Sequence, residues 1–282
     1  AGKTGMDAIV WLIERGISPD QITWVRPNDY WVFLRENIFN HPAFFETTMK
    51  TFQSDLEALS RVETPEEYCL ALEESGMWHR IDPEIWPTKF HAAVCSTDEM
   101  AKMRQVGNVV RDGHVQRIEP GRRILENGEV ALDEGCLFVD CTARAGAVLG
   151  KDAPPVFDGD TLHLFMLRPF QPLFSAALIA FLEAKVPDEA TRKACTRLVN
   201  FHDTPLEYIG QQLNSMANQY AWSQVPEVNN WINSCRLYAS NHLMVGLKPT
   251  DTDKFALLQR FGPLTKAAVA NIPKILQNAA TK

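Results

Sequence analysis

Residues 1–16 read AGKTGMDAIVWLIERG, a short glycine-rich turn that leads directly into an amphipathic pattern. Apolar residues recur on one broad face of this stretch, as expected for a helix packed on one side. Gly16 stands where a helix C-terminus favours glycine, and Pro19 follows it. We therefore expect a helix over about residues 5–15, preceded by a turn that contains two glycines.

The turn formed by Gly2, Lys3, Thr4 and Gly5 is a candidate phosphate site. Its spacing matches the last two glycines of the pattern G-x-G-x-x-G. In that pattern the backbone approaches a pyrophosphate, and the N-terminus of the helix faces the negative charge. A plain glycine turn before a helix would have the same spacing, so the motif alone leaves both interpretations open.

A β-favouring stretch, Ile22 to Arg26, follows the helix and is ended by Pro27, which has no N–H to donate. The end of this stretch lies about 20 residues after the glycines, where a dinucleotide-binding unit places its ribose-binding residue. An acidic residue there would select NAD, whereas the guanidinium of Arg26 suits the 2′-phosphate of NADPH. The alternative is that Arg26 is a solvated cation at a strand end.

Lys3 and Thr4 also permit a second interpretation, because Gly-Lys-Thr is how a P-loop ends. Lys would then contact the β- and γ-phosphates, Thr would bind magnesium, and residues 137–140 would serve as the Walker B strand. The strand ending at Arg26 and the short strands expected before Cys136 are not features that a P-loop predicts. This alternative therefore stays second.

The length of 282 residues leaves room for two domains. We expect the first over residues 1–150, with an aromatic-rich helical insertion at about 30–95, and the second over residues 151–282, mostly helical from Pro187 onward. The boundary is the Pro-, Asp- and Gly-rich stretch 151–160. The expected fold class is mixed α/β.

Turn signals punctuate the region after Gly107, where short strands are expected at 108–111, 115–118 and 123–125. We expect them to form a small antiparallel sheet. The apolar run 136–141 that follows is typical of a strand buried on both faces of a parallel sheet.

Composition narrows the function classes. The formal net charge is −7 with scattered cations, so we expect no nucleic-acid partner. No apolar run is long enough to span a membrane and no signal-peptide pattern opens the chain, which indicates a cytoplasmic protein. The 6 cysteines form no C-x-x-C pair and the 7 histidines no H-E-x-x-H spacing, so we expect no metal.

Four segments together resemble a known group of enzymes: residues 1–8 (AGKTGMDA), residues 22–27 (ITWVRP), residues 115–129 with VQRIEP and LENGE, and residues 138–143 (FVDCTA). They look like parts of the FAD/NAD(P)-binding oxidoreductases of the pyridine nucleotide-disulfide oxidoreductase superfamily, and most of all like the flavin-containing monooxygenase-like proteins. The resemblance covers roughly residues 1–182.

The resemblance implies a Rossmann-type NADPH domain inserted into an FAD domain, of which residues 151–282 would be the C-terminal portion with a helical extension. It implies that Thr142 and Ala143 stand at the turn where the chain returns to the flavin, although the usual glycine is missing. It also implies that Gln171 and Ser175, at a helix N-terminus, face the flavin ring, although Ser175 could equally be a helix cap. The family's own FAD-binding glycine motif would lie upstream of Ala1, so a fragment is expected.

The resulting hypothesis is an FAD-dependent oxidoreductase that uses NADPH as hydride donor and acts on a small-molecule substrate, with a monooxygenase favoured because the segment has no redox disulfide motif. A homo-oligomer is compatible with the sequence, and no side chain is assigned as acid, base or nucleophile. Besides the P-loop alternative, a non-catalytic dinucleotide sensor would explain the same motifs. The aromatic residues Trp24, Tyr30, Trp31, Trp78 and Trp86 could line a substrate pocket but are more typical of a core.

Overall fold

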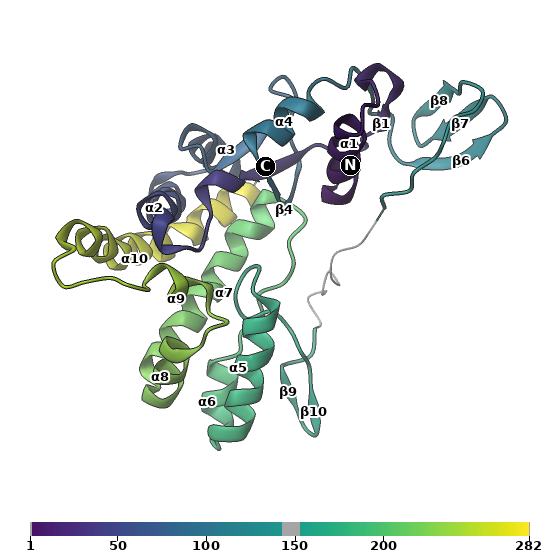
Figure 1. The fold of residues 1–282 in the computed structure, drawn as a ribbon. Helices are drawn as coiled ribbons and strands as arrows, with labels where there is room; N and C mark the ends of the chain where they lie inside the picture. Colours follow the sequence, from purple (N-terminus) through teal and green to yellow (C-terminus); the bar gives the residue numbers. More distant parts are fainter. Residues whose placement is uncertain (1, 143–152, 282) are drawn as a thin grey trace. The chain divides into compact units, whose positions relative to one another are not determined.

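The computed structural model describes residues 2–142 and 153–281, a mixed α/β chain in which helices predominate and the sheets are small (Figure 1). The chain forms two compact units. Of the described residues, unit 1 contains 2–35 and 78–142, and unit 2 contains 36–77 and 153–281. This division differs from the expected one in one respect: most of the insertion expected at about 30–95 groups with the C-terminal residues.

The elements of unit 1 are α1 (Lys3–Glu14), the 3₁₀ turn Pro19–Gln21, β1 (Thr23–Val25), β2 (Tyr30–Leu34), β3 (Trp78–Arg80), β4 (Lys89–Cys95), α4 (Thr97–Met103), β5 (Asn108–Val110), β6 (Val115–Glu119), β7 (Arg122–Leu125) and β8 (Gly128–Ala131). The expected first helix is confirmed as α1, and Gly16 follows it with the positive φ of 90° that glycine permits. The strand expected at 22–26 is confirmed as β1.

The expectation of one antiparallel sheet after Gly107 was wrong for its first strand. β5 pairs parallel with β1, with Val25 opposite Val110, whereas β6, β7 and β8 form a separate antiparallel sheet. The reason is that Asn108–Val110 is apolar enough to join the core, which holds α1, β1 and α4 residues such as Met6, Trp24 and Met103. The polar β6 forms a hairpin with β7 instead.

The helical insertion expected at about residues 30–95 is only partly helical, because three strands lie in it besides α2 and α3. β2 pairs antiparallel with β3 and parallel with β4, in the order β3-β2-β4. Its sequence Tyr-Trp-Val-Phe-Leu consists of residues that favour strands, and its three central side chains are buried. Tertiary packing of these aromatic rings therefore overrides the helical pattern of the neighbouring segments.

The run 136–141, expected to be a buried strand, forms no strand in the structure, and most of it is exposed. Leu137, Phe138 and Val139 are 87%, 48% and 60% exposed. A strand needs a neighbour that satisfies its backbone N–H and C=O groups, and no strand of the described chain pairs with this run. Apolar composition alone was therefore insufficient evidence for a buried strand.

Unit 2 contains the 3₁₀ turns Arg35–Asn37 (which begins at the unit boundary) and Pro42–Phe44, then α2 (Phe45–Arg61), α3 (Pro65–Glu74), β9 (Phe157–Asp158), β10 (Thr161–Leu162), α5 (Pro172–Lys185), α6 (Glu189–Ala194), α7 (Pro205–Gln224), α8 (Pro226–Ser234), α9 (Ala239–Leu243) and α10 (Thr252–Ala280). The expectation that residues after Pro187 are mostly helical is confirmed.

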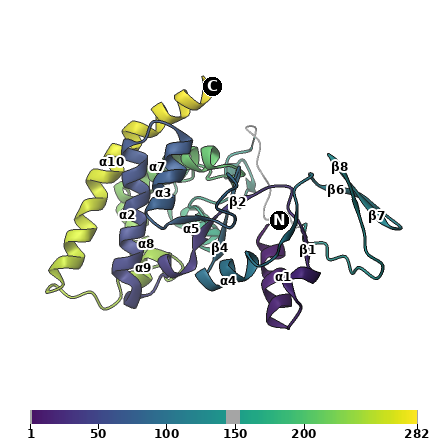
Figure 2. The same ribbon diagram turned by 90° about the horizontal axis from the view of Figure 1, so that it is seen from above.

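The long helix α10 runs beside α2, as Figures 1 and 2 both show, and it also contacts α7. Two side-chain amides fix the first contact: Gln53 donates to the carbonyl of Leu257 at 2.6 Å, and Asn271 donates to the carbonyl of Val62 at 2.7 Å. Segments about 200 residues apart are thus joined in one helical unit. A second core gathers around Phe174 and Leu178 of α5 with Trp222 of α7.

None of the helices in the described residues is both long enough and apolar enough to cross a membrane.

Candidate functional site

The glycine turn forms the N-terminus of α1, as the sequence predicted. Gly2 is the N-cap residue with an extended backbone, and its carbonyl accepts the first helical hydrogen bond from the N–H of Met6 at 3.1 Å. No side chain caps this end of the helix. The N–H groups of its first turn therefore point along the axis with the positive end of the helix dipole, which is the arrangement that binds anions.

Gly5 is buried and brings together two parts of the predicted site. A Cβ atom built on Gly5 would lie 3.7 Å from the Cβ of Cys141 and 4.0 Å from the Nε1 of Trp24. Cys141 directly precedes Thr142, so the glycine turn and the expected return turn are neighbours although 136 residues separate Gly5 from Cys141 in sequence. Both distances are ordinary van der Waals contacts, so the packing here does not demand glycine.

Trp24 contributes a polar group at this place. The residue is 5% exposed, and no acceptor in the described part of the chain receives the proton of its Nε1. Its guanidinium neighbour Arg26 lies over the indole ring, with 4.7 Å between the guanidinium carbon and the ring centroid. A buried N–H without an acceptor costs about 1–3 kcal/mol, so this indole is a candidate donor to a bound group.

Lys3 and Thr4, predicted to contact phosphate, lie at the surface of the first turn. The Lys3 ammonium pairs with Asp7 one turn along the helix and lies 3.8 Å from a carboxylate oxygen of Glu99. Thr4 is exposed. The ammonium group of Lys3 is thus paired with carboxylates in the structure, and these ion pairs would have to break before Lys3 could bind a phosphate.

Arg26 lies in a buried ion-pair network and not at the surface. It is 3% exposed, and its guanidinium pairs with Asp29, which is 7% exposed. Asp29 also accepts a hydrogen bond from the Nε of Arg111 at 3.1 Å, and Arg111 donates to Asp82 at 2.7 Å. Two guanidinium groups and two carboxylates therefore balance each other.

Burial above all, and then the nearby charge of Arg111, lower the pKa of Arg26 to about 10, while the charge of Asp82 opposes the change. The side chain stays protonated at neutral pH even so. The guanidinium of Arg26 was predicted to bind a 2′-phosphate. In the structure it is already paired with the carboxylate of Asp29, so it is not free to bind a ligand in this conformation.

Arg111 was missed by sequence reasoning, because its segment was assigned to an antiparallel sheet. In the parallel pairing of β1 and β5, Arg26 and Arg111 each follow the last paired residue of their strand. Ligands of open α/β sheets bind beyond the carboxyl ends of parallel strands, which is where both residues stand. The side chain of Arg111 is 32% exposed and is therefore the more accessible of the two cations.

The remaining predicted cofactor residues fall in different places. The backbone N–H of Thr142 donates to Asp140 at 2.8 Å, and Ala143 lies outside the described residues. In unit 2, Ser175 is 1% exposed, and its hydroxyl donates to the carbonyl of Gln171 and accepts from the N–H of Leu167. The alternative of Ser175 as the helix cap was also wrong: Gln171 is the N-cap residue of α5, no side chain caps this end, and the Ser175 hydroxyl lies one turn into the helix, where it bonds back to Gln171. Gln171 accepts from the N–H of Ala239 at 3.3 Å.

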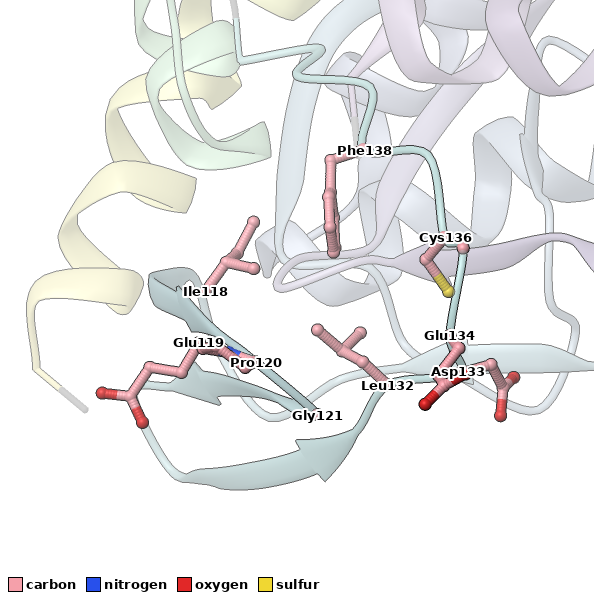
Figure 3. A pocket seen from close by; sticks show the side chains of 10 residues that line it. Ile118, Glu119, Pro120, Gly121, Leu132, Asp133, Glu134, Cys136 and Phe138 are labelled. Atoms are coloured by element: carbon pink, nitrogen blue, oxygen red, sulfur yellow. The ribbon is translucent and has the colours of Figure 1, made fainter.

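A cavity of about 360 Å³ lies beside the sheet β6-β7-β8 (Figure 3). The side chains of Ile118, Leu132 and Phe138 converge on it, and Asp133 and Glu134 stand near Cys136 at its edge. Its walls are thus largely apolar, with the acidic residues Glu119, Asp133 and Glu134 at its edges. Acidic and apolar side chains do not bind phosphate well. This cavity therefore differs in its chemistry from the glycine turn, which offers N–H donors to an anion.

The aromatic residues divide between core and surface. Trp31 and Trp78 are completely buried, with ring centroids 5.8 Å apart, whereas Trp86 is 41% exposed. Arg80 lies over the rings of both Trp31 and Trp86. Most of this cluster is therefore core. Among the described residues, no group of three His, Cys, Asp or Glu side chains could hold a metal ion.

Comparison with known proteins finds relatives but no described family. The chain is similar to "Uncharacterized protein Rv2000" and "Uncharacterized protein MT2056" of Mycobacterium tuberculosis and to "Uncharacterized protein Mb2023" of Mycobacterium bovis. Each is 33% identical over 260 residues, which is 92% of this chain and 47% of the relative. The chain thus spans about half the length of these curated relatives. No family model matches the sequence, and no solved structure matches it.

Proposed function

We propose that this protein binds NADPH at the N-terminus of α1 and belongs to an FAD-dependent oxidoreductase with a monooxygenase-like activity on a small-molecule substrate. The observation that carries the proposal is the juxtaposition at Gly5. The glycine turn, an uncapped helix N-terminus and the segment that leads to Thr142 lie together, in the combination that the resemblance to flavin-containing monooxygenase-like proteins implies.

The geometry supports binding of a pyrophosphate. The N–H groups of the first turn of α1 need acceptors, and the buried indole nitrogen of Trp24 lies close to the same turn, at Gly5. Because the net charge of the chain is −7, an anion gains nothing from the overall field and must be held by local donors. The helix N-terminus and the indole are such donors.

Selectivity for the 2′-phosphate of NADPH depends on the ion-pair network at the strand ends. Arg111 can approach a phosphate by leaving Asp82, since it is partly exposed, whereas Arg26 would have to leave Asp29 inside the protein. We therefore assign the first contact with the 2′-phosphate to Arg111, with Arg26 as the buried charge behind it. Arg111→Met should reduce the preference for NADPH over NADH.

The flavin part of the proposal rests on the resemblance alone. When bound, FAD supplies the electron-transfer chemistry that amino-acid side chains lack. Of the side chains expected to face it, Ser175 uses its hydroxyl for two backbone groups, so it does not fit a flavin contact.

The test is a binding titration of the purified protein with NADPH and NADH, with Gly2→Val as the critical variant. A Cβ at Gly2 meets nothing within 4 Å, and its backbone is extended, so valine should fold normally and cover the helix N-terminus. Gly128→Val is the matched control, because Gly128 also has open space around its Cβ position. We expect NADPH affinity to fall at least tenfold in Gly2→Val and to stay unchanged in Gly128→Val.

Equal NADPH affinity in both variants would contradict the proposed site. Binding of magnesium and ATP, lost in Lys3→Ala, would replace it with the P-loop alternative. NADPH binding without NADPH oxidation under any acceptor, including oxygen and added FAD, would favour a sensor over an oxidoreductase.

A further inference from the structure

A second buried polar cluster lies in unit 2, at the place where three helices meet. Asp55 of α2 accepts a hydrogen bond of 2.5 Å from the hydroxyl of Tyr68 of α3. It is also hydrogen-bonded to Tyr208 of α7, which contacts Gln212 one turn further along that helix. Tyr68 and Tyr208 are 0% and 4% exposed. One carboxyl group therefore links α2, α3 and α7.

The charge of this carboxyl is not balanced by an ion pair. Tyr68 faces it from α3, and Tyr208 and the neutral Gln212 lie on α7. Along α10, which also packs on α2, the cation Arg260 pairs with Glu57. No lysine, arginine or histidine in residues 2–142 or 153–281 forms an ion pair with Asp55.

Tyr208 connects the carboxyl to the turn before α5. Its ring stacks on Phe170 at 6.3 Å between centroids and packs on His202 at 4.9 Å. Phe170 has a φ of 59°, which is strained for a residue with a side chain. The contact with Tyr208 therefore helps to hold an unfavourable backbone conformation.

The same turn holds a second unsatisfied group. The Nη1 atom of Arg168 is buried, and it finds no hydrogen-bond acceptor within the described part of the chain. Its guanidinium lies over the ring of Tyr238 at 4.9 Å, and its positive charge acts on Tyr208. An opening of the turn would therefore hydrate Arg168 and relax Phe170 at the same time.

We propose that the Asp55 carboxyl is a proton-dependent latch for the turn formed by residues 168–171. With the proton bound, the neutral carboxyl stays between the two tyrosines and α7 holds the turn through Tyr208. When the proton leaves, the half-buried carboxyl carries a negative charge without a cation partner, and any motion that lets more water reach Asp55 becomes more favourable. The latch opens as the pH rises and does not depend on nucleotide binding.

The pKa of Asp55 sets the pH range of the latch. Burial raises it from 3.8 to about 6, against the opposing hydrogen bonds from Tyr68 and Tyr208. Opening is therefore expected to change most between about pH 5 and pH 7.

Hydrogen–deuterium exchange of the whole protein tests the latch directly. The exchange of residues 166–175, corrected for the intrinsic effect of pH, should increase at least tenfold between about pH 5 and pH 7.5. Asp55→Asn should abolish this increase, because asparagine keeps a hydrogen-bond acceptor for the tyrosines but cannot ionise. Glu46→Gln, on the same helix, should behave like the wild type.

Equal corrected exchange at both pH values in the wild type, or an unchanged increase in Asp55→Asn, would overturn the proposal. If Asp55→Asn does not fold, the carbon-13 chemical shift of the Asp55 carboxyl in the wild type decides the same question. A titration midpoint near 6 supports the latch, and a midpoint near 4 overturns it.

Discussion

The two units bury their charges in opposite ways. In unit 1, Arg26 and Arg111 at the ends of two parallel strands are balanced by Asp29 and Asp82. In unit 2, the single carboxyl of Asp55 is held by the neutral hydroxyls of Tyr68 and Tyr208. In the first arrangement each guanidinium is paired with a carboxylate. In the second arrangement the carboxyl of Asp55 has hydrogen bonds and no cation partner among the described residues.

This difference predicts different responses to pH. In the balanced network, Arg26 remains charged near neutral pH even with a pKa lowered to about 10. The half-buried carboxyl of Asp55, with a pKa raised to about 6 and no cation partner in the described part of the chain, changes its charge within the physiological range. Unit 1 is therefore suited to hold a fixed charge for a ligand, and unit 2 to respond to protons.

The largest expected effect is that of breaking the balanced network. Asp29→Ala should destabilise the protein by about 3–5 kcal/mol, because it leaves the buried guanidinium of Arg26 without its carboxylate. Urea unfolding measures this loss, with Asp133→Ala at an exposed position as the control. The double variant Arg26→Met with Asp29→Leu should recover most of the stability, since an apolar pair of similar size costs little there. A loss below 1 kcal/mol in Asp29→Ala would refute the balanced network.

The second expected effect concerns the isolated carboxyl. Because folding raises the pKa of Asp55 from 3.8 to about 6, the folded protein binds this proton more tightly than the unfolded chain. The stability from this group is complete below pH 3.8 and is lost as the pH rises to about 6, by about 3 kcal/mol in total. Asp55→Asn should lack this loss and be the more stable protein at pH 7.

Urea unfolding of wild type and Asp55→Asn at several pH values between about 4 and 7 checks this prediction. The difference in unfolding free energy between the two proteins should change with pH and level off above about pH 6. A difference that is independent of pH would show that Asp55 titrates normally. Unit 2 would then resemble unit 1 in its response to pH.

Local signals in the sequence were sufficient for the helices and for their ends. The helix expected at about residues 5–15 and its end at Gly16 stand as predicted, and α3 and α4 begin at caps of types that local sequence signals, Thr64 and Ser96. Each depends on residues within one or two turns, so no knowledge of the fold was needed. The same holds for the glycine turn at the start of α1.

Pairings between distant segments could not be derived in this way. Nothing local distinguishes residues 108–110 as the partner of β1 from the hairpin strands that follow, and this error concealed Arg111. The burial of Arg26 depends on Asp29 and Asp82, which reach it only through the folded chain. The partnership of α2 with α10, about 200 residues apart in sequence, was equally inaccessible.

A smaller effect tests a feature that both units share. Ser96 in unit 1 and Thr204 in unit 2 each begin a capping box. The hydroxyl of each accepts a hydrogen bond from the backbone N–H of a glutamate three residues later, and the carboxylate of that glutamate accepts one from the backbone N–H of the cap residue. Ser96→Ala and Thr204→Ala should each cost about 1 kcal/mol in urea unfolding. The cost at Ser96 should be the larger, because Glu99 also binds Arg35 at 2.9 Å. Equal costs would mean that this extra ion pair contributes nothing to the cap.

The smallest expected effect separates packing from ligand binding at Gly5. Gly210 of α7 is its counterpart in unit 2: a Cβ there would lie 3.8 Å from Leu276, much as a Cβ on Gly5 would lie 3.7 Å from Cys141. Both sites have room for a methyl group, so Gly5→Ala and Gly210→Ala should each stabilise their helix by about 0.5 kcal/mol. If unfolding shows this gain in both proteins while NADPH binding weakens only in Gly5→Ala, glycine at position 5 serves the approach of a ligand and not the fold. If NADPH binding is unchanged in both Gly5→Ala and Gly210→Ala, glycine at position 5 is required neither for packing nor for ligand binding. The proposed site would then depend on the helix N-terminus at Gly2 alone.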